Sequence, residues 1–188
     1  MNLPNRITVL RLILIPVFVA FFFIEAIPFN YLIALGIFAL AAFTDFLDGY
    51  IARKYDMITN LGKFLDPIAD KILVCTALIL LLTKETVMPG LLGSVCLTIV
   101  IAREFTVSAF RIIAASKDVI MAADMAGKIK TVVQFFAVFV LLFACQFTEY
   151  GFFIYIKWAG LALLLISTAL CVISGANYII KNIDVLKD

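Results

Sequence analysis

The stretch "TDFLDGYIARKYDMITNLGKFLDPIADK", from Thr44 to Lys71, carries five carboxylates between two strongly apolar segments. The apolar segments are "YLIALGIFALAAF" (Tyr31–Phe43) and "ILVCTALILLL" (Ile72–Leu82). An ionised carboxylate at the centre of a bilayer costs about 2.5–3.5 kcal/mol even on the mildest scales. The stretch therefore indicates a functional site at the ends of two membrane-spanning helices.

The composition is that of an integral membrane protein. The 188 residues are 65% hydrophobic, with a mean hydropathy of +1.15, whereas a soluble domain is roughly half apolar. About 20 mostly apolar residues are needed for a helix to cross the bilayer, and only helices or closed barrels satisfy their backbone groups there. Six apolar segments predict an all-α protein with six transmembrane helices in one domain, 1–188. The predicted spans are 7–27, 31–53, 65–83, 88–115, 128–147 and 152–180.

Basic residues are distributed unequally between the two sides of the membrane that the predicted spans define. Most lysines and arginines, Arg6 and Arg11 among them, fall on the side that contains the N-terminus, which the positive-inside rule assigns to the cytoplasm. We therefore expect a multi-pass protein of the cell membrane, with both termini and the acidic stretch facing the cytoplasm. The proline in "NLPNR" (Asn2–Arg6) is expected to break the helix there, so a short amphipathic segment is predicted on the membrane surface before the first span.

The spacing of the acidic residues predicts a metal site. Asp45 and Asp48 are three residues apart, and Asp66 and Asp70 are four apart, so each pair shares one face of a helix. The two helices are consecutive and antiparallel, which lets the pairs meet. Four close carboxylates repel one another unless cations lie between them, and hard oxygen ligands suit two Mg²⁺ or Mn²⁺ ions. The alternative is that these acids are only solvated at the membrane surface, as we expect for Asp56 in the predicted loop.

Three other residues of the stretch fit a phosphate ligand. Gly49 and Gly62 would let a ligand approach the backbone closely. Arg53 lies one helical turn beyond Gly49 and can form a two-pronged contact with phosphate oxygens. Because the chain contains no histidine, a carboxylate is the expected general base.

Together these residues form the pattern D-x2-D-G-x2-A-R-x8-G-x3-D-x3-D, which runs from Asp45 to Asp70. The pattern resembles, without departure, the signature of the CDP-alcohol phosphatidyltransferases. The resemblance implies six membrane helices and the transfer of a phosphatidyl group from a CDP-linked lipid to an alcohol, with release of CMP. It also implies site roles: Asp45, Asp48, Asp66 and Asp70 would bind two divalent cations, Asp66 and Asp70 would be catalytic with Asp70 as the base, and Gly49, Arg53 and Gly62 would contact the CDP group.

Three further segments bear on the acceptor alcohol. "NLPNRITVLRLILIP" (Asn2–Pro16), "REFTVSAFR" (Arg103–Arg111) and "GKIKTVVQ" (Gly127–Gln134) are similar to the bacterial branch of this family that uses sn-glycerol 3-phosphate, with CDP-diacylglycerol as donor. That acceptor is a dianion and needs fixed cations.

The candidate cations for the acceptor phosphate are Arg103, Arg111, Lys128 and Lys130. Arg103 and Arg111 lie about two helical turns apart and share one face. A charge as deep as Arg103 should face the interior of the bundle, with Glu104 as a possible neighbour. The two lysines could instead simply mark the inner membrane boundary.

Other functions stay open at this point. The acceptor could be phosphatidylglycerol, inositol phosphate or serine with the same chemistry. A cation-coupled transporter is a more remote alternative, because transporters commonly bind ions near the midplane of the membrane. The small net charge of +2 says little about partners, but the lack of a nucleic-acid motif and of a basic tail indicates no nucleic-acid partner. The oligomeric state is open, a homodimer included.

Overall fold

The computed structural model describes residues 3–55, 60–116 and 125–182, and their regular structure is entirely helical. The helices are α1 (Leu3–Phe23), α2 (Asn30–Lys54), α3 (Asn60–Leu82), α4 (Gly90–Ser116), α5 (Met125–Gln146) and α6 (Phe153–Asn182). These six helices correspond one to one to the six predicted segments, so the prediction of an all-α membrane protein is confirmed.

Within the described residues, five of the helices are long and apolar enough to cross a membrane. In α3 the apolar part among the described residues is Lys71–Leu82. By sequence, the first turns of α3 contain Lys63, Asp66 and Asp70. The helix that carries half of the acidic stretch is thus polar at its beginning and apolar at its end.

One prediction about the N-terminus is wrong. No separate surface segment precedes the first span in the described residues, because α1 begins at Leu3 and continues without interruption to Phe23. Pro4 therefore lies in the first turn of α1. The N–H groups of a first turn have no partner within the helix, so proline is tolerated there although it would break a helix interior.

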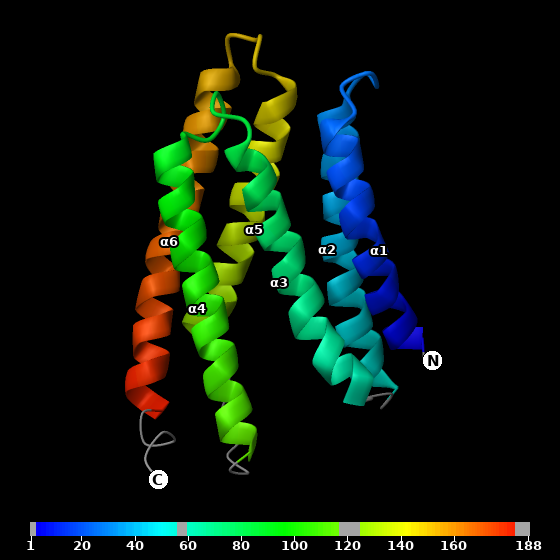
Figure 1. Ribbon diagram of the computed structural model, residues 1–188, viewed down its shortest axis with the longest axis vertical. Coiled ribbons are helices and arrows are strands. Elements are labelled where there is room, and N and C mark those ends of the chain that lie inside the picture. The colour runs from blue at the N-terminus through cyan, green and yellow to red at the C-terminus, as the bar shows by residue number, and fades with distance from the viewer. Residues whose placement is uncertain (1–2, 56–59, 117–124, 183–188) are drawn as a thin grey trace.

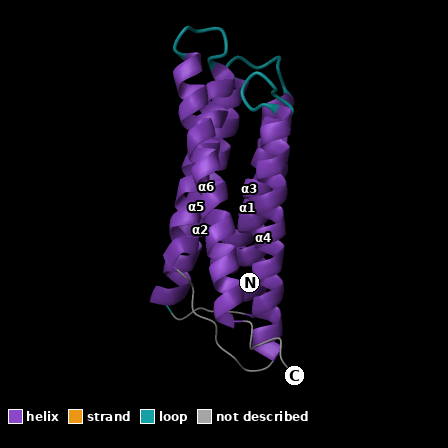
Figure 2. Cartoon of the chain, turned by 90° about the vertical axis from the view of Figure 1, so that its left-hand side faces the viewer, coloured by secondary structure: helices purple, strands orange, loops and turns teal. Residues whose placement is uncertain are grey.

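The helices run along one long axis, and the described loops gather at one end (Figure 2). The opposite end holds the beginnings of α1, α3 and α5 and the last turns of α2, α4 and α6 (Figure 1). We call this end the motif end, because the acidic stretch lies there. α1 packs mainly against α2 and also against α3, and α6 packs against both α5 and α4.

The interior of the bundle is an apolar core, and much of its outer surface is apolar too. Phe18, Phe22 and Phe38 are fully buried, and the rings of Phe18 and Phe38 lie 5.8 Å apart between α1 and α2. On the outside, Phe105 and Tyr155 are more than 70% exposed. Apolar side chains outside as well as inside are expected where the surrounding solvent is lipid.

Candidate functional site

The first half of the signature meets a cation from another helix. Arg11 of α1 is completely buried and contacts two aspartates of α2 at once. Its Nη1 lies 2.6 Å from Asp45 Oδ1 and its Nη2 lies 2.5 Å from Asp48 Oδ2. Thr8, one turn earlier on α1, donates a longer bond of 3.4 Å to Asp48 Oδ2. We call this group of four residues the Arg11 fork.

Burial differs between the two carboxylates. The side chain of Asp48 is 2% exposed, whereas that of Asp45 is 39% exposed. Asp48 is therefore held inside the bundle, where a carboxylate needs a cation or hydrogen-bond donors to remain ionised. Asp45 lies on the same helix face, one turn earlier, and is open to a ligand.

Gly49 directly follows Asp48 in α2 and is half-buried, and the remaining signature residues are placed by their helices only. Arg53 lies in the last turn of α2, Gly62 in the first turn of α3, and Asp66 and Asp70 one turn apart further along α3. The end of α2 and the beginning of α3 lie together at the motif end (Figure 1). The side chains of Arg53, Asp66 and Asp70 lie outside the described part of the structure, and so does Asp56.

The described acidic groups fit a hard divalent cation in their chemistry. An ionised carboxylate has about four acceptor positions, so a contact with Arg11 does not exhaust Asp45 or Asp48 as ligands. Carboxylate oxygens are the ligand atoms that Mg²⁺ and Mn²⁺ prefer. Among the described side chains, no three acidic, cysteine or histidine groups come together. The other two predicted ligands, Asp66 and Asp70, have side chains outside the described part of the structure.

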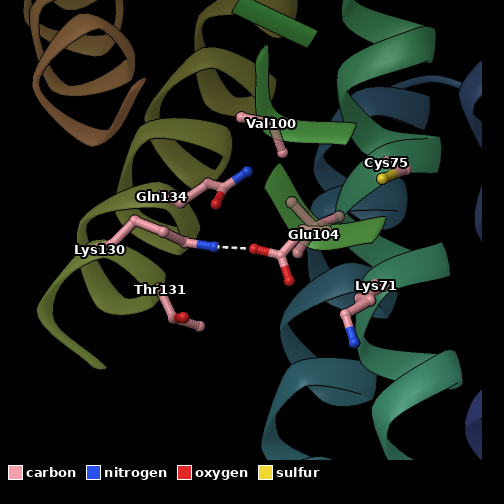
Figure 3. Close-up of a pocket in the computed structure, with 8 residues that line it drawn as sticks. Lys71, Cys75, Val100, Glu104, Lys130, Thr131 and Gln134 are labelled. Atoms are coloured by element: carbon pink, nitrogen blue, oxygen red, sulfur yellow. Dashed lines mark hydrogen bonds and ion pairs between the residues drawn. The ribbon is translucent and has the colours of Figure 1, made fainter. Parts of the chain in front are cut away.

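A second charged cluster lies between α4, α5 and α6. Glu104 accepts a hydrogen bond from Lys130 of α5 (Figure 3). It also accepts one from its own neighbour Arg103, whose Nη1 lies 2.9 Å from Glu104 Oε1. Arg103 Nη2 also donates to Ser174 Oγ of α6, at 3.2 Å. The predicted proximity of Arg103 and Glu104 is thus confirmed. We call Arg103, Glu104, Lys130 and Ser174 the Glu104 cluster, and it connects three helices.

Two glycines make room for Arg103. A Cβ atom at Gly175 would lie 3.0 Å from Arg103 Cγ, and one at Gly127 would lie 3.3 Å from Arg103 Nη2. Both contacts are tighter than most Cβ contacts, so Arg103 would have to shift by a few tenths of an ångström if either position carried a side chain. At Gly127 the contacting atom is the flexible end of the arginine, so Gly175 matters more for the close approach to this side chain.

A small pocket of about 30 Å³ opens beside the Glu104 cluster. Its polar lining comes from Lys71, Glu104, Lys130, Thr131 and Gln134, and Figure 3 shows these side chains around it. Gln134 is 3% exposed, and its Nε2 has no hydrogen-bond partner among the described residues. A buried amide without a partner is costly, so this lining suits a polar ligand or a water molecule.

The four predicted acceptor cations do not form one cluster. Arg103 and Lys130 lie together at Glu104, and Lys130 is only 3% exposed. Arg111 lies two turns closer to the motif end, with Nε 3.4 Å from the Tyr178 hydroxyl and its guanidinium 5.8 Å from the centre of that ring. Lys128 is exposed.

Sequence reasoning missed the roles of Arg11 and Gln134. It counted Arg11 only as one basic residue of the cytoplasmic side. A signal was available, because an ionisable residue within an apolar span usually faces a polar partner inside the bundle. For Gln134 the signal is weaker, because the residue lies inside the predicted span 128–147 but carries no charge.

Comparisons with known proteins agree with the signature and the fold. The model of the family described as CDP-alcohol phosphatidyltransferase matches residues 1–173. The chain belongs to the CDP-alcohol phosphatidyltransferase family.

Within this family the chain is similar to two bacterial proteins named CDP-diacylglycerol–glycerol-3-phosphate 3-phosphatidyltransferase. The protein from Bacillus subtilis is 39% identical over 99% of this chain and 97% of its own length. The protein from Rickettsia bellii is 38% identical over 94% of this chain and 93% of its own length. A rice protein named cardiolipin synthase (CMP-forming) is 37% identical over 96% of this chain but only 57% of its own length.

Proposed function

We propose that the protein transfers the phosphatidyl group of CDP-diacylglycerol to sn-glycerol 3-phosphate, giving phosphatidylglycerophosphate and CMP. The observation that carries this proposal is the complete signature from Asp45 to Asp70, in a chain similar over nearly its whole length to bacterial enzymes named for this reaction. The fold supports it, because α2 and α3 bring both halves of the signature to one end of the bundle.

The reaction is a displacement at phosphorus. The 1-hydroxyl oxygen of glycerol 3-phosphate forms a bond to the lipid-side phosphorus of CDP-diacylglycerol, and the bond from that phosphorus to the CMP oxygen breaks. Asp70 accepts the proton of the attacking hydroxyl. Gly49 and Gly62 allow the CDP group to approach the helix backbones, and Arg53 binds diphosphate oxygens.

Divalent cations are part of this proposal. Asp45, Asp48, Asp66 and Asp70 would together hold two of them, Mg²⁺ or Mn²⁺. When bound, such ions neutralise the negative charge of the diphosphate and of the leaving CMP. The carboxylates of the chain supply the charge that retains them.

We assign the acceptor phosphate to the cations on α4 and α5. Arg111 is available to an anion, because only its Nε takes part in a hydrogen bond among the described residues. Arg103 lies deeper, at the Glu104 cluster, and Lys128 is exposed at the beginning of α5. Lys130 is already paired with Glu104, so its role would be to fix the position of α5 against α4 as well as to add positive charge.

The membrane setting explains why the site lies at a helix end. The lipid donor reaches it from the bilayer, and the water-soluble acceptor and CMP reach it from the aqueous side. The positive-inside pattern supports a cytoplasmic position for the motif end and for both termini, in the cell membrane.

Release of CMP distinguishes this function from ion transport. Purified protein with CDP-diacylglycerol, Mg²⁺ and glycerol 3-phosphate should release CMP, and omission of the acceptor should abolish that release. CMP release without any alcohol would indicate hydrolysis instead. No CMP release, together with cation flux in sealed vesicles, would favour the transporter alternative.

A further inference from the structure

The Arg11 fork sets a buried cation directly against two of the proposed metal ligands. Arg11 is 0% exposed, and its two terminal nitrogens each contact a different carboxylate, at 2.6 and 2.5 Å. α1 packs against α2 along this face. A charge at this depth has a cost, which such close ionic contacts offset.

The geometry suits arginine in particular. Asp45 and Asp48 lie one helical turn apart, and like charges at this spacing repel each other. A planar guanidinium has two parallel donor nitrogens that can hold two acceptors at a fixed separation. A lysine ammonium carries the same charge on a single nitrogen, so it cannot span both carboxylates in this way.

Building on the metal site of the proposed function, we propose that Arg11 is a positioning residue for that site. It fixes Asp45 and Asp48 through one oxygen each, so that both carboxylates face the cation site before a cation arrives. Residues that orient metal ligands typically change metal affinity by roughly 10- to 100-fold when they are replaced. Thr8 supports the same oxygen of Asp48 from the preceding turn of α1.

A competing role makes the opposite prediction. If Arg11 only neutralised the aspartates, it would repel an incoming cation, and its loss would strengthen metal binding. The substitution Arg11→Lys separates the two roles, because it keeps the charge and removes the two-pronged contact. Arg6→Lys is the matched control, since Arg6 is an exposed arginine on the same helix.

The test is a titration with Mn²⁺ of full-length protein in lipid nanodiscs without substrates, with free Mn²⁺ followed by electron paramagnetic resonance. The wild-type protein and Arg6→Lys should have the same Kd, and Arg11→Lys should have a Kd raised roughly 10- to 100-fold. Equal or tighter binding by Arg11→Lys would overturn the inference. That outcome would leave the metal site intact, because the wild-type protein would still bind Mn²⁺.

Two further measurements keep the test decisive. The Tm of each variant, taken without metal, shows whether it is folded. If Arg11→Lys cannot be isolated folded, Arg11→Gln takes its place. Loss of the positive charge alone favours tighter Mn²⁺ binding, so weaker binding by Arg11→Gln can come only from lost positioning of the aspartates. Equal or tighter binding overturns the inference. No Mn²⁺ binding by the folded wild-type protein would overturn the metal site, and this inference with it.

Discussion

Lys130 of α5 donates a hydrogen bond to Glu104 of α4 inside the helix bundle (Figure 3). The same carboxylate accepts a bond from Arg103, which continues to Ser174 of α6. One acidic side chain thus connects three helices and holds two of the predicted acceptor cations. Loss of one partner of a buried ion pair leaves the other charge without compensation.

The first prediction concerns the stability that Glu104 provides. Glu104→Gln keeps the size of the side chain and removes its charge, so Arg103 and Lys130 are left as neighbouring cations. We expect a loss of about 3–5 kcal/mol in the free energy of unfolding, measured as a lowered Tm in detergent. Glu149→Gln, at an exposed position between α5 and α6, is the control and should leave Tm unchanged. Equal Tm values for both variants would mean that the cluster contributes nothing to packing.

The second prediction concerns acceptor binding by Arg111. Arg111→Gln removes a charge-assisted contact with the acceptor phosphate, worth about 1.5–3 kcal/mol. The KM for glycerol 3-phosphate should therefore rise roughly 10- to 150-fold, with little change in the KM for CDP-diacylglycerol. Steady-state kinetics with each substrate varied at saturating levels of the other measures both.

Lys181 provides the comparison for Arg111. It is exposed in the last turn of α6, at the same end of the bundle, so Lys181→Gln tests whether general surface charge is enough. If the KM for glycerol 3-phosphate rose equally in both variants, the effect would come from the general positive charge at this end of the bundle and not from a specific contact of Arg111. An unchanged KM in Arg111→Gln would place the acceptor phosphate elsewhere.

The third prediction concerns the signature aspartates. Replacement of Asp45, Asp48, Asp66 or Asp70 by Asn keeps the volume and removes a ligand charge or the base. Each variant should lose at least about 100-fold in kcat, the low end for a general base or an electrostatic stabiliser. Asp56→Asn should change the rate only slightly. If Asp56→Asn were as damaging as Asp66→Asn, the assignment of the functional helix face would be wrong.

The fourth prediction concerns the cations themselves. Activity should vanish when a chelator removes divalent metal and should return on addition of Mg²⁺ or Mn²⁺, because four carboxylates need counter-charge to bind a diphosphate. Assays in metal-depleted buffer with stepwise addition of each ion measure this. Full turnover in metal-free buffer would rule out the proposed metal site.

Much of the fold could be predicted because apolar runs and helix ends have local causes. The predicted span 31–53 corresponds to α2 (Asn30–Lys54), and the predicted span 152–180 to α6 (Phe153–Asn182). The exception is Pro4. Proline breaks a helix in its interior, but Pro4 lies in the first turn of α1, where it is tolerated. The sequence could not locate the beginning of α1 to within the few residues that separate these two cases.

The contacts between helices could not be predicted in the same way. Arg11 meets Asp48 across 37 positions of sequence, and Lys130 meets Glu104 across 26. Such pairs depend on the rotation of each helix about its own axis, which is set by packing along the whole interface. The sequence could place all of these charges near one side of the membrane, but it could not show which of them pair.

An acceptor panel with product analysis tests the proposed acceptor most directly. Purified protein is incubated with CDP-diacylglycerol and Mg²⁺, and separately with glycerol 3-phosphate, phosphatidylglycerol, inositol phosphate or serine, and the lipid product is identified by mass spectrometry. We expect phosphatidylglycerophosphate and equimolar CMP with glycerol 3-phosphate, and little product with the other alcohols. Efficient conversion of another alcohol, with no product from glycerol 3-phosphate, would show that the proposed acceptor is wrong.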